Sequence, residues 1–364
     1  MPKKIKVLIV DDSALIRMLL TNALSSSNEI EVVGAAEDPF VARDLIKQTQ
    51  PDVITLDIEM PKMDGITFLK NLMRLRPLPV IMISTLTKKG ANVTLKALEY
   101  GAVDFVAKPD TDIKDNLMAY SAILIDKVKA AARANVGQVD VSVPKTISSP
   151  VQATKAEEPR ATTPPRASTT PRTKQYDLIA IGASTGGTEA IKTVITNLPD
   201  NLPPIIMTQH IPPVFSTSFA NRLNDNAQMT VIEPTESMPL LPGHAYLAPG
   251  DKHMVVVSKG GKLYMQLDDS APVNRHKPSV EVMFNSVAKT VNKRCIAVML
   301  TGMGADGAQA MKNLDDLGAH TIAQDKDSSV VWGMPGAVVQ LGGAQEQLPV
   351  NKIGPRLKEL LYKK

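Results

Sequence analysis

The sequence predicts two doubly wound parallel α/β domains joined by a flexible linker. Apolar strand-like runs alternate with helix-like patterns in the first third of the chain and again after residue 175, and between them this periodicity stops. At 364 residues the chain also exceeds one typical domain. Aromatic residues make up only 4%, which favours aliphatic α/β layers over an all-β sandwich. We expect domains at 1–125 and 175–364, with a helix end and linker at 126–174.

Charge and cysteine usage narrow the class of protein. Residues 134–174 hold six basic and three acidic residues, so this stretch carries +3 of the net charge of +4. The remaining +1 argues against a nucleic-acid-binding face. The single cysteine, Cys295, excludes an internal disulfide and fits a reducing compartment. The short apolar run at the start does not favour a signal peptide, and no segment approaches membrane-spanning length, so we expect a cytoplasmic protein.

The first domain is predicted from five apolar strands with helical patterns between them. Ser13 is placed to cap the first helix, which carries apolar residues from Leu15 to Ala23. This alternation implies a parallel sheet with its site at the carboxyl ends of the strands. The expected strands are Ile5–Val10, Glu31–Gly34, Val53–Asp57, Val80–Ser84 and Val103–Ala107.

Polar residues gather at those strand ends. They are Asp11 and Asp12 after the first strand, Asp57 after the third, Ser84 after the fourth and Lys108 after the fifth. Three converging carboxylates repel one another unless a cation binds, and Mg²⁺ prefers such oxygen ligands. A lysine and a hydroxyl beside the ion suit a phosphoryl group on Asp57. Each acid taken singly also fits a helix cap or a solvated loop, but five matching strand ends favour the site.

These motifs resemble a response-regulator receiver domain, and the likeness covers residues 1–125. The resemblance implies a flavodoxin-like fold in which Asp57 accepts the phosphoryl group. Asp12, Asp57 and the backbone carbonyl of Glu59 would hold Mg²⁺, with Asp11 assisting through water. Ser84, Phe105 and Lys108 stand at the switch positions. The matching segments are Val10-Asp11-Asp12-Ser13, Leu56-Asp57-Ile58-Glu59-Met60-Pro61-Lys62-Met63-Asp64-Gly65 and Val106-Ala107-Lys108-Pro109.

A last helical pattern runs from Asn116 to Arg133, and the linker follows it. Residues 134–174 contain six prolines, many Ser and Thr residues and no aromatic residue, so they cannot bury a core. This composition predicts a flexible interdomain linker, with a docking segment as the alternative.

The second domain opens on a serine-containing turn between a strand and a helix. The strand-like run Asp177–Ile181 leads into Gly182-Ala183-Ser184-Thr185-Gly186-Gly187, after which apolar residues recur at helical spacing. Gly-x-Ser-x-Gly fits the nucleophile elbow of serine hydrolases. A dinucleotide fingerprint with serine in place of its middle glycine, a phosphate-binding turn and a simple helix cap are the alternatives.

Two further residues complete a hydrolytic constellation. His210 follows the strand-like run Pro204–Gln209, and Asp306 lies in the glycine-rich exit from Cys295–Leu300. Parallel strands bring these ends to one edge, so the serine, a base and an orienting carboxylate are expected to meet. The chain order differs from that of α/β-hydrolases, so a different fold is expected. The weaker rivals are His244, His253, His276, His320, Asp315, Asp316, Asp325 and Asp327, which suit loops or solvated faces.

This half resembles the catalytic domain of the chemotaxis protein-glutamate methylesterases, the CheB family, and the order of receiver, linker and esterase matches that family. The matching segments are Ile181-Gly182-Ala183-Ser184-Thr185-Gly186-Gly187, Gln209-His210-Ile211-Pro212, Tyr246-Leu247-Ala248-Pro249-Gly250, Arg275-His276-Lys277-Pro278-Ser279-Val280, Leu300-Thr301-Gly302-Met303-Gly304-Ala305-Asp306-Gly307 and Gly333-Met334-Pro335.

The resemblance implies a phosphorylation-activated serine hydrolase on a Rossmann-like fold. It would demethylate γ-glutamyl methyl esters and deamidate glutamines on chemoreceptor helices, with Ser184, His210 and Asp306 as its triad. Backbone N–H groups of Thr185 and Met303 would hold the oxyanion, and Arg275, His276 and Met334 would line the substrate site. The receiver would need Mg²⁺ and a chemotaxis histidine kinase, whereas the esterase reaction would need no cofactor. Contact with membranes would be peripheral, through the receptors, with no nucleic-acid partner.

Two other functions fit a receiver with an output domain. A nucleotide-binding module is disfavoured by the serine in place of the second fingerprint glycine and by His210, rather than an acid, at the end of the next strand. A DNA-binding output domain is disfavoured by the near-neutral folded part and the lack of a helix-turn-helix pattern.

Overall fold

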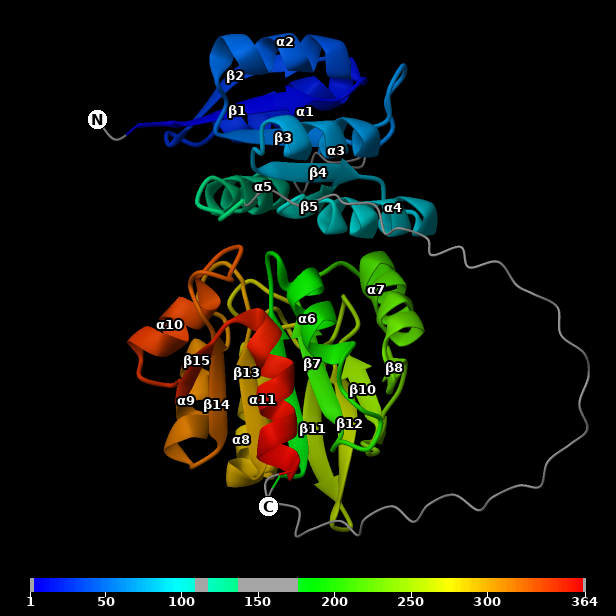
Figure 1. Cartoon of the computed structure of the whole chain (residues 1–364), viewed down its shortest axis with the longest axis vertical. Helices are drawn as coiled ribbons and strands as arrows, with labels where there is room; N and C mark the ends of the chain where they lie inside the picture. The colour runs from blue at the N-terminus through cyan, green and yellow to red at the C-terminus, as the bar shows by residue number, and fades with distance from the viewer. Residues whose placement is uncertain (1–2, 109–116, 137–175, 363–364) are drawn as a thin grey trace, which may run out of the picture.

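The computed structural model describes residues 3–108, 117–136 and 176–362, which form two stacked α/β units (Figure 1). Residues 137–174 of the linker predicted at 134–174 lie outside these residues. Each unit is built on a parallel sheet, as the alternation of strand and helix patterns predicts. Within the described residues, no helix combines the length and the apolar character needed to span a membrane.

The first unit contains a five-stranded sheet in the order β2-β1-β3-β4-β5, the flavodoxin-like order. Alternate strand residues face opposite helical layers: Leu8 packs toward α2 and α3, whereas Val7 and Ile9 pack toward α1 and α5. Ser13 caps α1, as predicted, by accepting a hydrogen bond from Ile16 N. The elements are β1 (Ile5–Val10), α1 (Ala14–Ser25), β2 (Ile30–Ala36), α2 (Pro39–Thr49), β3 (Val53–Asp57), α3 (Gly65–Leu75), β4 (Val80–Ser84), α4 (Lys88–Glu99), β5 (Asp104–Ala107) and α5 (Leu117–Ala131).

The second unit contains a seven-stranded parallel sheet in the order β15-β14-β13-β6-β7-β10-β8. Its first strand, β6, is central, because β7 continues the sheet on one side and β13 on the other. The carboxyl ends beside such a switch in strand order form a crevice. The elements are β6 (Leu178–Ala183), α6 (Gly187–Ile195), β7 (Ile205–Gln209), α7 (Pro213–Asn226), β8 (Thr230–Ile232), β10 (His244–Leu247), α8 (Val280–Thr290), the 3₁₀ helix η2 (Asn292–Arg294), β13 (Cys295–Met299), α9 (Ala308–Asp316), β14 (His320–Gln324), α10 (Met334–Gln340), β15 (Glu346–Leu348) and α11 (Val350–Tyr362).

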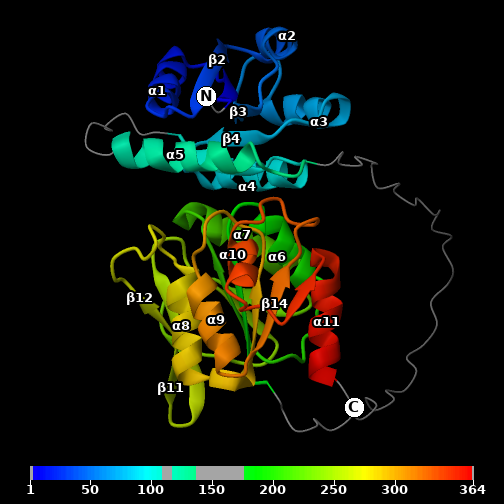
Figure 2. The ribbon, with the colours of Figure 1, turned by 90° about the vertical axis from the view of Figure 1, so that its left-hand side faces the viewer.

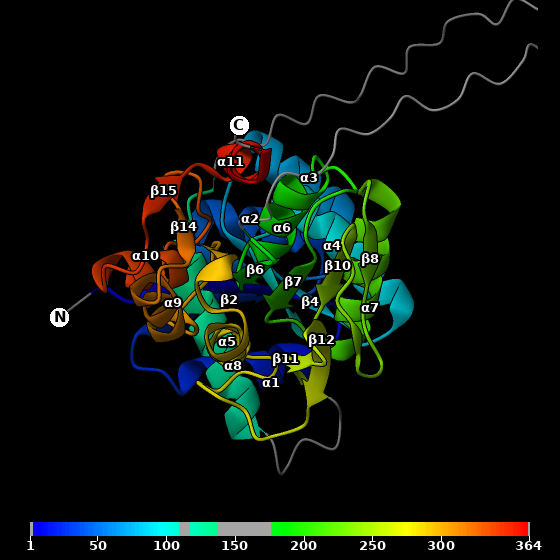
Figure 3. The same ribbon diagram turned by 90° about the horizontal axis from the view of Figure 1, so that it is seen from below.

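Helices cover both faces of this sheet, and β6 is apolar on both sides for that reason (Figure 3). Ile179 and Ile181 pack with residues of α6, α7 and α11, whereas Leu178 and Ala180 pack with residues of α8, α9 and α10. Burial on both sides explains why the run reads as continuously apolar rather than alternating.

A small antiparallel sheet was not anticipated from the sequence. It consists of β9 (Met238–Pro239), β11 (His253–Lys259) and β12 (Lys262–Asp268) in the order β11-β12-β9. Hydrogen bonds between Val256 and the side chains of Ser286 and Thr290 fasten β11 to α8. The hairpin therefore places His253, a rejected candidate for the base, at the buried start of a strand rather than in a loop.

The first unit sits on the carboxyl-terminal edge of the second sheet (Figures 1 and 2). Helix α4 packs against α6 and α7, and β5 reaches the same surface. The Phe105 ring stacks on Phe215 with centroids 4.2 Å apart, so apolar packing continues across the interface. Glu99 on α4 pairs with Lys192 and Arg222 of the second unit.

Candidate active site and acidic cluster

Ser184 lies in the turn between β6 and α6, where the sequence places a nucleophile elbow. Gly186 adopts a positive φ of 75°, a conformation that side chains other than glycine rarely tolerate. A Cβ on Gly187 would lie 2.1 Å from Gln209 Oε1, so the turn requires glycine there as well. The Ser184 amide donates to Thr301 O over 3.0 Å, which holds the turn against the segment after β13.

The structure brings the three predicted triad residues together. His210 Nδ1 is 3.1 Å from Ser184 Oγ, and His210 Nε2 is 2.9 Å from Asp306 Oδ2. The carboxylate can only accept, so Nε2 carries a proton and Nδ1 is left with a lone pair facing the serine hydroxyl. This arrangement can deprotonate Ser184 and stabilise the resulting imidazolium.

Asp306 is buried at the amino terminus of α8. It accepts hydrogen bonds from Ser279 Oγ and Asn274 Nδ2, each at 2.8 Å, and from Val280 N at 2.7 Å. Burial acts to raise the pKa of Asp306, but the bonds and charge from His210, together with those of Asn274 and Ser279, lower it to about 2. The carboxylate is therefore ionised at any pH where the protein works.

His276 stacks face to face on His210, with ring centroids 3.7 Å apart and an angle of 10° between the planes. Burial, and then the proximity of His210, lowers the pKa of His276 to about 3. The neighbouring Arg275 is exposed and reaches Asp126 on α5 at 3.4 Å. Of these two predicted substrate-site residues, His276 thus lies against the base of the triad, whereas Arg275 reaches the first unit.

Thr185 and Met303, whose backbone N–H groups are predicted to hold the oxyanion, each follow one member of a closely packed pair of residues. Thr185 comes directly after Ser184, and Met303 comes after Gly302, whose Cβ position would lie 2.8 Å from Ser184 Cβ. The same position would lie 2.4 Å from Met334 Sδ, which places the third predicted substrate-site residue at this point. The backbone after β13 therefore passes directly beside the serine.

Some residues at the site were not singled out from the sequence. Gln209 Nε2 donates to Ser184 O over 2.9 Å and to His210 O over 3.3 Å, joining the two reactive residues through their backbones. Asn274 and Ser279 bond Asp306 from a loop and a helix start. Ser279 lies within a recognised motif and Asn274 directly before it, which was a signal, but only the fold shows that both side chains bond the Asp306 carboxylate.

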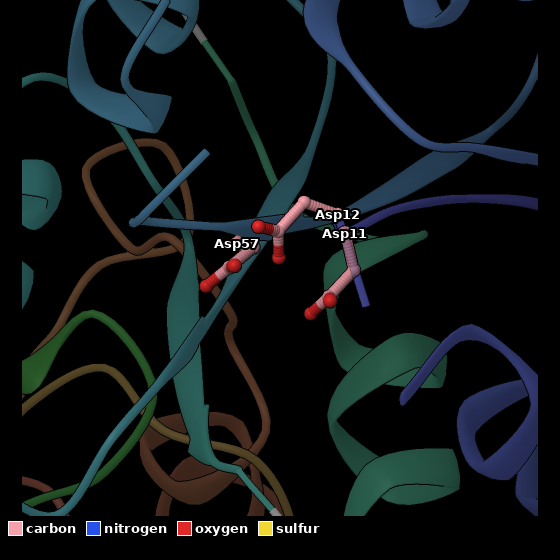
Figure 4. A group of neighbouring side chains, drawn as sticks. All are labelled: Asp11, Asp12 and Asp57. Atoms are coloured by element: carbon pink, nitrogen blue, oxygen red, sulfur yellow. The ribbon is translucent and has the colours of Figure 1, made fainter. Parts of the chain in front are cut away.

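The predicted acidic site also assembles at the ends of β1 and β3. The carboxylates of Asp11, Asp12 and Asp57 gather there, each offering an oxygen within 4.8 Å of the others (Figure 4). Lys108 Nζ lies 2.7 Å from Asp57 and 3.4 Å from Asp11. Burial and the Asp11 carboxylate raise the pKa of Asp57 to about 6, against the opposing effect of Lys108.

The donor set of this cluster fits a hard divalent cation. Asp11 Oδ2 and Asp57 Oδ2 are buried and have no hydrogen-bond partner among the described residues apart from the Lys108 ammonium. Oxygen-only donors of this kind suit Mg²⁺. Gly65 keeps the following loop close, because a Cβ there would lie 2.0 Å from the Asp57 carbonyl oxygen. Glu59 lies in the same loop and is exposed.

The other two predicted switch residues connect this cluster to the interface. Ser84 ends β4, where its neighbour Ile83 pairs with Asp57, and its hydroxyl accepts from Thr94 on α4 at 2.8 Å. Phe105 is buried on β5 and stacks on Phe215 across the interface. The adjacent Asp104 accepts a hydrogen bond of 2.6 Å from Thr185, the residue after Ser184.

Comparisons with known proteins match both units. The family model for the response regulator receiver domain matches residues 7–118, and that for CheB methylesterase matches residues 179–357. The solved CheB methylesterase catalytic domain of Thermotoga maritima is 39% identical, with a TM-score of 0.50 over 51% of this chain and 98% of that one.

Curated relatives match this chain over nearly its whole length. A protein-glutamate methylesterase/protein-glutamine glutaminase of Hydrogenovibrio crunogenus is 50% identical over 99% of this chain and 100% of its own length. One from Saccharophagus degradans is 53% identical over 98% of each chain. The chain therefore belongs to the CheB family of protein-glutamate methylesterase/protein-glutamine glutaminase enzymes, with a receiver domain ahead of the methylesterase domain.

Proposed function

We propose that this enzyme hydrolyses γ-glutamyl methyl esters, and deamidates glutamines, on the cytoplasmic helices of chemoreceptors, and so resets signalling in chemotactic adaptation. The observation that carries the reaction is the hydrogen-bonded line from Ser184 through His210 to Asp306. The names of the full-length relatives supply the class of substrate. A cytoplasmic location follows from this substrate, and contact with the membrane is peripheral.

The reaction proceeds by acyl transfer to Ser184. Its Oγ forms a bond to the ester carbonyl carbon while His210 Nδ1 takes the hydroxyl proton. The backbone N–H groups of Thr185 and Met303 hold the oxyanion. When the C–O bond to methanol breaks, His210 returns the proton to the leaving oxygen. A water molecule, deprotonated by the same ring, then attacks the acyl-enzyme and releases glutamate; with glutamine as substrate the leaving group is ammonia.

The substrate site surrounds the triad. In this proposal it is lined by Arg275, His276 and Met334. His276 stacks on His210, Met334 lies against Gly302 beside Ser184, and Arg275 reaches the receiver. The exposed guanidinium of Arg275 suits the acidic side chains of a receptor helix, whereas the fully buried Met334 supplies apolar packing under Gly302, next to Ser184.

Control of the reaction is assigned to the receiver. A histidine kinase supplies the phosphoryl group to Asp57. Asp12, Asp57 and the Glu59 carbonyl would hold Mg²⁺, with Asp11 assisting through water, and the bound ion would neutralise charge on the phosphoryl oxygens. Ser84 and Lys108 then contact the phosphoryl group. The contacts from Glu99, Asp104 and Phe105 to the catalytic domain support a docked, inhibited state that phosphorylation weakens.

The test is methanol release from methylated receptor membranes, with and without acetyl phosphate and Mg²⁺. Release should vanish in Ser184→Ala. Phosphodonor should stimulate the wild type but not Asp57→Asn, which keeps the catalytic domain unchanged. Absence of release from a wild type that is demonstrably phosphorylated on Asp57 would exclude the esterase assignment while sparing the receiver.

A further inference from the structure

A third histidine, besides His210 and His276, is linked to the Asp306 carboxylate through Ser279. His253, the first residue of β11, is fully buried, and both of its ring nitrogens are engaged. Nδ1 lies 3.1 Å from the Ser279 amide nitrogen, and Nε2 lies 3.1 Å from the Ala271 carbonyl oxygen. An amide can only donate and a carbonyl can only accept, so the ring is neutral with its proton on Nε2.

Ser279 connects His253 to Asp306 through its backbone amide on one side and its hydroxyl on the other. It is the N-cap residue of α8, with extended backbone angles of −114° and 136°, yet its side chain makes no capping bond to the helix. Instead its hydroxyl donates to Asp306 Oδ1 over 2.8 Å. The Asp306 carboxylate takes over the capping role, because it accepts from Val280 N at 2.7 Å.

The start of α8 and the Asp306 carboxylate are therefore joined by hydrogen bonds, and His253 links both of them to the β11–β12 hairpin. Its Nδ1 accepts the backbone N–H of the same serine whose hydroxyl orients Asp306. The helix leaves this N–H without a partner of its own, since it lies ahead of the first turn. A buried N–H without a partner is destabilising, so the chain gains from a fixed acceptor here.

We propose that His253 is a positioning residue for the hydrolytic reaction: by accepting the Ser279 amide proton it fixes the serine that orients Asp306, and through Asp306 it aligns His210. This inference rests on the proposed triad mechanism. It assigns to His253 no contact with substrate and no proton transfer.

Two conservative substitutions separate the two bonds of His253. In His253→Asn the amide oxygen occupies the place of Nδ1 and can still accept from Ser279. In His253→Gln the longer amide reaches the place of Nε2 and can still donate to Ala271, but the acceptor for Ser279 is lost. We expect His253→Asn to keep kcat within about threefold of wild type. For His253→Gln we expect kcat to fall between about 10- and 100-fold, as misalignment of about 1 Å can produce, with KM unchanged.

Ser286→Ala is the matched control. It also removes a bond between α8 and β11, the 2.9 Å contact with the Val256 amide, but at a point farther along the helix from Asp306. It should lower the melting temperature without lowering kcat. The assays use the full chain in the presence of phosphodonor. The rate at which a fluorophosphonate labels Ser184 should follow kcat, since that reagent needs the triad but not the receptor.

A double-mutant comparison tests the route through Ser279. If His253 acts by placing the Ser279 hydroxyl, then His253→Gln should reduce kcat far less in a Ser279→Ala background than in wild type. Additive losses, or equal kcat values for His253→Asn and His253→Gln, would overturn the inference while leaving the triad intact. Absence of methanol release from the wild type would instead contradict the proposed function on which this inference rests.

Discussion

At the scale of single residues, His210 turns Nδ1 toward the nucleophile and Nε2 toward the carboxylate. Asp306 therefore fixes which nitrogen carries the proton. In Asp306→Asn the amide can donate to Nε2 and stabilise the opposite tautomer, whose Nδ1–H cannot accept from Ser184. We expect kcat to fall by about 10⁴-fold, as in the comparable serine protease substitution. The melting temperature should fall as well, because an amide NH2 facing Nε2 cannot accept the hydrogen bond that Val280 N donates to Asp306 Oδ2. Asp315→Asn, on α9, is the control that should retain activity.

His276 gives a second prediction at this scale, on stability in acid. Its pKa is lowered from 6.5 to about 3 by burial and by His210, so between these values the unfolded chain binds a proton that the folded chain does not. Stability therefore rises with pH across this window and is lost as the pH falls. His276→Phe keeps an aromatic ring on His210 but cannot titrate. Its calorimetric melting temperature should fall less than that of wild type between pH 7 and pH 4; parallel curves would contradict this explanation.

The sequence could bring the predicted triad together because each member follows an apolar strand, and parallel strands bring their ends to one edge. It could not identify His253 or Ser279 as supports for Asp306. His253 begins a strand of the small antiparallel sheet, and its contact with the start of α8 depends on how that hairpin packs. Local patterns carry no information on such packing between distant segments. For the same reason the role of Gln209, which bonds two backbones at once, could not be read from its position.

At the scale of elements, strands buried on both sides were predicted most accurately. The strands Ile5–Val10, Val53–Asp57 and Val80–Ser84 have the predicted bounds, because these mainly apolar runs end at polar residues. The strands β9, β11 and β12 were not predicted. They are partly exposed, so polar residues interrupt their apolar pattern, and β9 has only two residues. Their pairing depends on register rather than on composition.

The contact of α4 with α6 and α7 leads to a prediction about the docked receiver. Glu99 is partly buried and pairs with both Lys192 and Arg222, and although burial opposes it, this pairing lowers the pKa of Glu99. Glu99→Gln removes the charge but keeps the shape. Fluorophosphonate labelling of Ser184 without phosphodonor should become about two- to tenfold faster, the range expected for a partly exposed ion-pair network.

The matched control is Glu29→Gln, which removes the ion pair between Glu29 and Lys129 within the receiver. This pair joins two parts of one domain and does not reach the catalytic domain, so labelling of Ser184 should keep its wild-type rate. Equal acceleration in both variants would mean that loss of receiver stability, rather than loss of docking, exposes the serine.

At the scale of the whole molecule, the acidic cluster around Asp57 and the proposed triad communicate only if both bias the same docked state. Asp57 lies beside Ser84, which bonds α4 through Thr94, while the same helix holds Glu99 against the catalytic domain. A path of packed contacts does not by itself demonstrate coupling. Thermodynamic linkage supplies the test, because coupling between two sites must be reciprocal.

Beryllium fluoride, a phosphoryl analogue, makes this reciprocity measurable in the presence of Mg²⁺. If the analogue binds the undocked receiver preferentially, its apparent affinity is reduced by the undocked fraction. Glu99→Gln raises that fraction, so calorimetric titration should give tighter binding by the same factor by which labelling of Ser184 accelerates. Glu29→Gln should change neither quantity. Faster labelling with an unchanged affinity for beryllium fluoride would separate docking from phosphorylation, and the receiver would then control the enzyme through a surface other than α4.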